Sequence, residues 1–433
     1  MAATIVGNSI SATTPATNKL NGIAAGASIF FQDIHNDATD SECNAAGLSY
    51  GCGDGLYPPT DLYHLFKPAF DSGARIHSNS WGCATSEDEP FACNVYSSQA
   101  KHIDDFVHTH QDFLVLVAAG NDGQLATGYT VGDPATCKNC LAVGASQLNA
   151  DQVAADAVYM DPSMFCDHLA SPPSCCKTKP PTCTRQNCCD AAAAAGFCAP
   201  CCDTPCSLTS ANNLAEFSSK GPTFDARFKP DIVAPGEHIT SACAGISPAT
   251  ASQAAQASGS ANHCDVSPTA TTNRALTSMS GTSMATPLMA GALEYAGLPA
   301  FYSADPPLIP EIFRYVRQYY LRGYFPSGAG NVSNKLNAVP EALMRATIIA
   351  GARPISGTVA DSSGNRVPLP TWYPNFAIGF GRPMLDRSLY AHCSMHQFAP
   401  PRRQLVTLTT GRLVQHRPMR VSPLLCAIKH FTR

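Results

Sequence analysis

Between residues 25 and 144, short apolar segments alternate with amphipathic ones, and this alternation constrains the fold more than any other feature. The segment Phe113–Ala118 is a run of apolar and β-branched residues, which is typical of a buried strand. Strand–helix–strand order implies βαβ units, so we expect an α/β fold with a parallel sheet, in which functional sites form at the carboxyl ends of strands. The expected strands are residues 28–34, 75–79, 113–118, 141–143 and 231–234, and the expected helices are residues 62–70, 100–107, 282–296, 309–321 and 340–350.

The composition excludes several classes of protein. Of the 433 residues, 45% are hydrophobic and only 14% are charged, which is too apolar for a disordered chain. The net charge is −4, so there is no global basic field to make nucleic acid the main partner. The longest apolar run, Phe113–Ala119, is far too short to span a membrane. We therefore expect no nucleic-acid partner and no membrane span.

Residues 148–212 interrupt the strand and helix pattern with a cluster of cysteines. Ten of the 20 cysteines fall within this segment. We expect an insertion in a loop, held together by disulfides instead of by a hydrophobic core. The pairs Cys198-x-x-Cys201 and Cys137-x-x-Cys140 are also compatible with zinc ligation, but adjacent Cys-Cys pairs and the lack of a regular second pair favour disulfides.

The cysteine content also bears on the compartment. Disulfides persist in oxidising surroundings, so we expect a secreted or extracytoplasmic protein. The segment Met1–Gly7 lacks the basic start and the long apolar stretch of a secretion signal. We therefore expect no signal peptide in this sequence.

A serine is placed at the start of an expected helix. In Ser278–Pro287, small residues lead into a helical run, so Ser283 would lie in the first helical turn. The unpaired N–H groups and the positive dipole end of a helix surround a hydroxyl in that position, and they would stabilise the oxyanion that forms when it attacks a carbonyl. Ser and Thr are also ordinary helix caps, and the tripeptide Gly-Thr-Ser alone would indicate no more than that.

The full ten-residue segment resembles the catalytic-serine motif of the subtilisin-like serine proteases, the subtilases. Other segments are similar to further motifs of that family, in the family's order. Ser78–Gly82 resembles the substrate-binding strand, and Val117–Asn121 resembles the loop of the oxyanion hole. The remaining matches are residues 217–222 and 229–236, which resemble the stretch before the catalytic helix, and residues 379–382 and 385–386, which resemble a C-terminal signature of some larger members.

This resemblance implies a role for each matched residue. Ser283 would be the nucleophile, and its backbone N–H and the Asn121 side chain would bind the oxyanion. Such a side-chain donor contributes about 3 kcal/mol, a value known from an asparagine of a subtilisin. The residues that would bind an extended polypeptide substrate are Ser78, Ser80, Trp81, Gly82, Ala119 and Gly120. Calcium is a frequent ligand of the family, but no acidic loop here has convincing ligand spacing, so we expect no cofactor.

The resemblance also divides the chain. It covers residues 1–390 as a partial subtilisin-like peptidase domain, interrupted by the cysteine-rich insertion at 148–212. Residues 391–433 hold seven Lys or Arg and no Asp or Glu. We expect a poorly ordered basic tail there, with a basic docking arm as the alternative.

The aspartate and histidine motifs of the family, D-[ST]-G and H-G-T-H, do not occur in this sequence. The segment Ala2–Gly7 resembles the helix that follows H-G-T-H, so we expect an N-terminally truncated domain without the family's N-terminal strands. His77 lies next to the substrate-binding strand but has no evident carboxylate partner, so we do not expect it to act as the base. Without a base, Ser283 remains a protonated alcohol, and we expect little turnover by this chain.

Three explanations are compatible with these observations. The sequence is a fragment of a secreted subtilase, which accounts for the absent motifs and the cysteines together, and we favour this one. Alternatively, it is a catalytically dead homologue that binds peptides along residues 78–82. A structural or adhesion protein built around the cysteine-rich insertion is the third.

Overall fold

The computed structural model describes residues 1–7, 22–24, 27–36, 55–86, 89, 91–125, 128–149, 210–242, 276–291, 312–361 and 366–389. The core of the cysteine-rich insertion, with its Cys198-x-x-Cys201 pair, and the basic tail lie outside these ranges. The strands and helices below belong to the described part of the chain.

A four-stranded parallel sheet forms the centre of the fold. Its strands are β3 (Ile76–Asn79), β4 (Leu114–Ala118), β5 (Leu141–Ser146) and β6 (Ile232–Pro235), in the order β3-β4-β5-β6. All residues of β4, β5 and β6 are buried, as expected for parallel strands covered on both faces. The expected α/β class with a parallel sheet is therefore confirmed.

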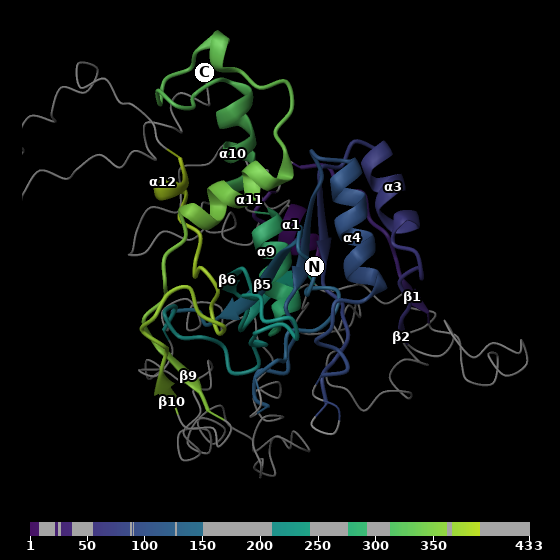
Figure 1. Cartoon of the computed structure of the whole chain (residues 1–433), viewed down its shortest axis with the longest axis vertical. Helices are drawn as coiled ribbons and strands as arrows, with labels where there is room; N and C mark the ends of the chain where they lie inside the picture. Colours follow the sequence, from purple (N-terminus) through teal and green to yellow (C-terminus); the bar gives the residue numbers. More distant parts are fainter. Residues whose placement is uncertain are drawn as a thin grey trace, which may run out of the picture.

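Helices cover both faces of this sheet (Figure 1). The first face carries α3 (Tyr63–Asp71) and α4 (Ser98–Thr109), and Val115 and Val117 point into the apolar core beneath them. On the opposite face, Leu114 and Leu116 of the same strand pack in the core that contains α9. The helices of that second side are α9 (Thr282–Gly291), α1 (Ala2–Val6), α10 (Ile312–Leu321) and α11 (Glu341–Ala350).

Smaller elements surround the sheet. Antiparallel pairs are β1 (His35–Asn36) with β2 (Gly55–Leu56), β7 (Ile239–Ala242) with β8 (Leu276–Met279), and β9 (Thr358–Ala360) with β10 (Arg366–Pro368). The two remaining elements are the 3-10 helix η4 (Val332–Asn334) and α12 (Leu385–Ser388). Strand β8 leads directly into α9, and the Gly281 N–H at this junction donates to the Gly236 carbonyl at 2.8 Å, just after β6.

The prediction of a strand at residues 28–34 is wrong. This segment has no strand structure, and three of its apolar side chains are exposed, with Phe31 at 68%. It approaches the sheet through a side chain instead, since Gln32 donates to the Leu65 carbonyl at 2.8 Å and lies 3.1 Å from the His77 ring. An apolar run becomes a strand only where a neighbouring strand pairs with its backbone, and the described part of β3 pairs with β4 alone.

The two ends of the insertion lie side by side. Ser146, the last residue of β5, forms a bridge with Leu214. The Ala211 N–H donates to the Asn149 side chain at 3.1 Å. The insertion therefore leaves and rejoins the described structure at one place, next to the carboxyl end of β5.

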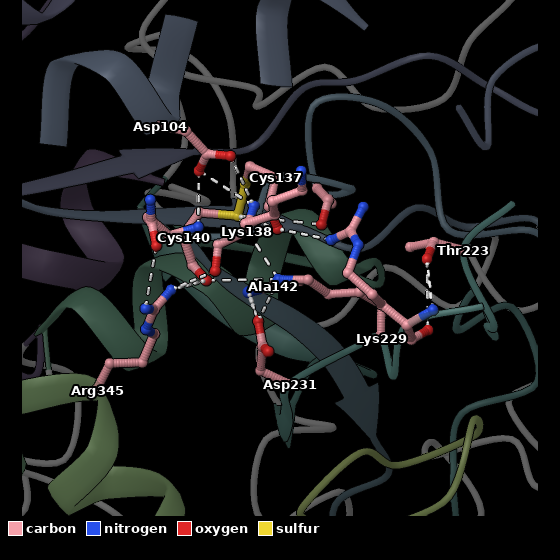
Figure 2. Close-up of polar contacts among 12 residues, drawn as sticks. Asp104, Cys137, Lys138, Cys140, Ala142, Thr223, Lys229, Asp231 and Arg345 are labelled. Carbon is pink, nitrogen blue, oxygen red and sulfur yellow. Dashed lines mark hydrogen bonds and ion pairs between the residues drawn. A yellow bond between two sulfur atoms is a disulfide. The ribbon is translucent and has the colours of Figure 1, made fainter. Parts of the chain in front are cut away.

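A polar network lies at the amino end of β5 and β6 (Figure 2). Lys229 is only 3% exposed and forms a 2.6 Å ion pair with Asp231, immediately before β6. The same Asp231 carboxylate accepts the Ala142 N–H of β5 at 2.7 Å. One carboxylate therefore joins the starts of two adjacent strands.

The Cys137–Cys140 disulfide closes the turn before β5. This confirms the disulfide interpretation for that pair over zinc. The Asp104 carboxylate of α4 accepts the Lys138 and Asn139 N–H groups at 3.1 and 2.7 Å, and Arg345 of α11 donates to the Lys138 carbonyl at 2.7 Å (Figure 2). Helices from both faces of the sheet thus hold this turn.

Candidate active site

Ser283 lies in the first turn of α9, as expected from the sequence. Its hydroxyl donates to the Ser80 carbonyl at 3.2 Å, and the Ser80 hydroxyl donates to the Ser283 carbonyl at 2.9 Å. Ser80 follows β3 directly, so these two bonds bring the helix N-terminus to the carboxyl end of the sheet. The helix dipole directs positive charge to the same place.

Asn121 lies beside the residue that precedes Ser283. Its side-chain oxygen accepts the Thr282 N–H at 2.8 Å and the Thr282 hydroxyl at 2.9 Å. Both bonds engage the oxygen of the Asn121 amide. They leave the NH₂ group of the same amide pointing away from Thr282. A Cβ on Gly281 would lie 3.6 Å from the Asn121 nitrogen, which places that donor next to the start of α9.

Gly120 brings the loop after β4 close to the helix. Its φ is +111°, and a Cβ there would lie 2.7 Å from the Ser219 hydroxyl. A side chain at this position would both strain the backbone and collide with Ser219. The Gly120 N–H donates to the Thr282 hydroxyl at 3.2 Å, while the preceding Ala119 still bonds to Val143 of β5 at 3.0 Å.

Residues 78–82, the substrate-binding strand expected from the sequence, are only partly in the sheet. Ser78 pairs with Leu116 in the sheet, and the ladder ends after Asn79. Trp81 packs against the core on the α3 and α4 side. Gly82 is tightly packed, since a Cβ there would lie 2.9 Å from the Asp133 carbonyl.

A carboxylate connects the two backbone segments of the site. Asp122 follows Asn121 and accepts the Thr85 N–H, three residues after Gly82, at 2.8 Å. Burial raises the pKa of the Asp122 carboxyl above its usual range, and the Thr85 bond opposes that shift. The Asp122 N–H in turn donates to the Ser219 hydroxyl at 3.0 Å.

His77 is placed on the wrong face to activate Ser283. It pairs with Val115, and its ring packs 4.9 Å from Phe66 in the core beneath α3. Ser283 belongs to α9 on the opposite face. Burial lowers the pKa of His77 to about 4, so it is neutral near pH 7. In the described ranges, no histidine or carboxylate makes a hydrogen bond to the Ser283 hydroxyl.

The structure thus brings together residues that the sequence places more than 160 positions apart. The serine motif gives no role to Thr282, which makes two bonds to Asn121. Ser219 was likewise unassigned, and it supports both Gly120 and Asp122. A hydroxyl directly before the serine was a visible signal for Thr282, whereas nothing in the sequence indicates where Ser219 would lie.

The described ranges also bear on metal binding and on membrane insertion. No group of three or more His, Cys, Asp and Glu side chains there could hold a metal ion. Within the same residues, no helix has the length and apolar character required to cross a membrane.

Comparison with protein families identifies a match over most of the chain. The model of the subtilase family, Peptidase_S8, matches residues 1–297. Two similar proteins of Dictyostelium discoideum are the serine protease/ABC transporter B family proteins tagD and tagB. The tagD protein is 32% identical over 400 residues, which covers 88% of this chain and 19% of tagD. The tagB protein is 32% identical over 380 residues, which covers 82% of this chain and 18% of tagB. This chain therefore spans about a fifth of the length of these relatives.

Solved structures show a more distant similarity. The prenylagaramide maturation protease PagA has a TM-score of 0.37 and 14% identity, with 78% of this chain and 68% of PagA covered. The patellamide maturation protease PatA has a TM-score of 0.34 and 16% identity, with 76% and 66% covered.

Proposed function

This chain belongs to the subtilase family, and on that premise we propose that it is a serine endopeptidase that cleaves polypeptides through an acyl-enzyme at Ser283. The contact between Thr282 and Asn121 supports this most directly, because it holds a side-chain amide beside a serine at a helix N-terminus. The family assignment rests on the match over residues 1–297.

In the proposed reaction, the Ser283 oxygen attacks the carbonyl carbon of a peptide bond. The carbonyl oxygen becomes an oxyanion, and the Ser283 N–H and the Asn121 amide nitrogen donate to it. The amine then leaves, and water hydrolyses the ester. The extended peptide lies along residues 78–82 and opposite Ala119 and Gly120, where backbone groups bind it like an added strand.

The attack requires a base that takes the Ser283 proton. The described residues place only the Ser80 carbonyl at this hydroxyl, and a carbonyl oxygen is too weakly basic to remove the proton. Loss of a base lowers the rate by several orders of magnitude, while the oxyanion donors sustain a residual rate. We therefore expect the isolated chain to turn over slowly.

We place the protein in an oxidising, extracytoplasmic compartment. Two disulfides, Cys83–Cys93 and Cys137–Cys140, support this. In reducing compartments such bonds are rare outside redox catalysis and sensing.

A fluorophosphonate probe tests the proposed function, since it labels serines activated for attack. The chain and the longest native polypeptide that contains it are treated in parallel, and the labelled peptide is identified by mass spectrometry. We expect label on Ser283, and none after Ser283→Ala. Ser72→Ala changes an exposed serine at the end of α3 and should leave labelling unchanged. Unlabelled Ser283 in both polypeptides would contradict the assignment.

A catalytically dead peptide-binding protein is the second candidate. It is favoured by one observation, that the Ser283 hydroxyl is bonded to a backbone carbonyl without a base among the described residues. Peptide binding without labelling of Ser283 in either polypeptide would support it.

A further inference from the structure

The Cys83–Cys93 disulfide lies directly after the substrate-binding strand. Cys83 is exposed to solvent, whereas Cys93 is buried. We propose that this disulfide is a redox-sensitive regulator that holds residues 81–83 in the position required for peptide binding. This proposal rests on the proposed function, because it assigns regulation to the same site.

Both cysteines are bonded to one residue. The Cys83 N–H donates to the Asp133 carbonyl at 2.8 Å, and the Asp133 N–H donates to the Cys93 carbonyl at 2.7 Å. The preceding Gly132 packs so closely that a Cβ on it would lie 2.1 Å from the Cys83 carbonyl oxygen. The disulfide therefore joins two cysteines that are both hydrogen-bonded to the backbone of Asp133, so a shift of Cys83 would disturb this segment.

The disulfide acts on the half of the strand that lies beyond the sheet ladder, in which the Trp81 side chain also packs against the core. Ser78 is held by the sheet and Ser80 by its two bonds to Ser283. Beyond them, the backbone bonds of the described residues go from Cys83 to Asp133 and from Thr85 to Asp122. Because Asp122 follows Asn121, loosening residues 83–85 would disturb both backbone segments that bind the peptide.

Reduction of this bond follows thiol–disulfide exchange with a dithiol. A thiolate of the dithiol attacks the sulfur of Cys83, which is the exposed residue of the pair, the sulfur–sulfur bond breaks, and Cys93 leaves as a thiolate. The second thiol of the dithiol then attacks the dithiol's first sulfur, which is bonded to Cys83 in the mixed disulfide, and Cys83 is released as a thiolate. Both cysteines take up protons, and the dithiol, having supplied two electrons, becomes a disulfide.

The second disulfide provides an internal control. Cys137 and Cys140 are both 0% exposed, so an attacking thiolate has no access to them in the folded protein. Their turn is also held by Asp104 and Arg345. A dithiol should therefore reduce Cys83–Cys93 at a concentration that leaves Cys137–Cys140 intact.

Peptide binding gives the direct test. Fluorescence polarisation measures the Kd for a fluorescein-labelled tetrapeptide library on the oxidised chain, on the chain after mild dithiothreitol treatment, and on Cys83→Ser/Cys93→Ser. Alkylation and mass spectrometry show which bond was reduced. We expect the Kd to rise about tenfold in the treated chain and in the double variant. Cys137→Ala/Cys140→Ala should keep the wild-type Kd.

Two results would overturn the proposal. One is an unchanged Kd when Cys83–Cys93 is shown to be reduced. The other is an equal rise in both double variants, which would indicate general loosening of the fold. If the serine variant does not fold, the selectively reduced wild-type chain carries the test.

Fluorophosphonate labelling of the same samples separates this proposal from the proposed function. The probe is small and does not contact residues 81–83, so Ser283 should still be labelled after reduction. If peptide binding depends on the redox state but Ser283 is never labelled, the proposed role of the disulfide is supported and the proposed peptidase activity is contradicted. If Ser283 is labelled in a chain that binds no peptide, the peptidase activity is supported and the role of the disulfide is contradicted.

Discussion

The two ends of the parallel sheet differ in how they use polar groups. At the amino end, Lys229, Asp231 and the turn at Cys137–Cys140 satisfy one another in a buried network (Figure 2). At the carboxyl end, Ser283 and Asn121 are held by neighbours on one side only, so a hydroxyl and an amide donor remain available to a ligand. The charged groups at the amino end pair with each other and hold the strands together. The polar groups at the carboxyl end can still form hydrogen bonds with a ligand.

The geometry of parallel strands explains this division. All four strands point the same way, so the loops that leave them gather at one end of the sheet. The N-terminus of α9 meets those loops and directs the positive end of the helix dipole toward them. The polar groups of the amino end instead fix where β5 and β6 begin.

Breaking the amino end should have the largest effect on stability. Lys229→Met leaves the Asp231 carboxylate, which is 14% exposed, without its ion-pair partner, and we expect a loss of about 3 kcal/mol in the free energy of unfolding, measured in urea. In the double variant Lys229→Met/Asp231→Asn neither charge remains and an oxygen still accepts the Ala142 N–H, so most of that loss should be recovered. An equal loss in both variants would show that the ion pair is not the origin of the effect.

At the carboxyl end, Asn121→Asp should affect chemistry more than stability. It retains an oxygen that accepts from Thr282 but lacks the amide donor. We expect the fluorophosphonate labelling rate of Ser283 to fall about 10²–10³-fold, as for loss of one oxyanion donor. Asn121→Ala should give a comparable fall. A rate within about threefold of wild type in both variants would exclude Asn121 as a donor.

Between the two ends, His77 makes stability depend on pH. Its pKa is about 4 in the folded state, because of burial, and about 6.5 when unfolded. The depressed pKa contributes stability that is complete above pH 6.5 and is lost as the pH falls to 4, in total up to about 3 kcal/mol. Thermal unfolding at several pH values measures this. His77→Leu should flatten the profile in that window, and an unchanged slope would assign the effect to other groups.

The smallest expected effect concerns Thr282. Thr282→Val removes the hydroxyl bonds to Asn121 and Gly120 but leaves the bond from the Thr282 N–H to Asn121 in place. We expect the labelling rate of Ser283 to fall about fivefold, which corresponds to about 1 kcal/mol, and the free energy of unfolding to fall by about 1 kcal/mol. Thr282→Ser retains the hydroxyl and should restore the rate. A valine variant as fast as wild type would mean that the backbone bond alone orients the amide.

Much of this architecture was predictable from local pattern. The expected strands at 75–79, 113–118, 141–143 and 231–234 and the helices that cover the sheet occur within a few residues of their predicted bounds. The spacing of apolar residues within a short segment indicates a strand or a helix, so these elements can be detected in the sequence. The ordered motifs likewise identified Ser283 and Asn121 as residues to examine together.

Other features depend on contacts between distant residues. The apolar segment 28–34 reads as a strand, yet its structure depends on a backbone partner that its own composition does not specify. The same holds for Thr282 orienting Asn121, for Ser219 supporting Gly120, and for the position of Cys83 beside Asp133. Motif and periodicity predicted the family, the sheet and a serine at the start of a helix. Only the folded chain decided which groups lie beside that serine, because hydrogen-bond geometry is set by partners that lie far apart in the sequence.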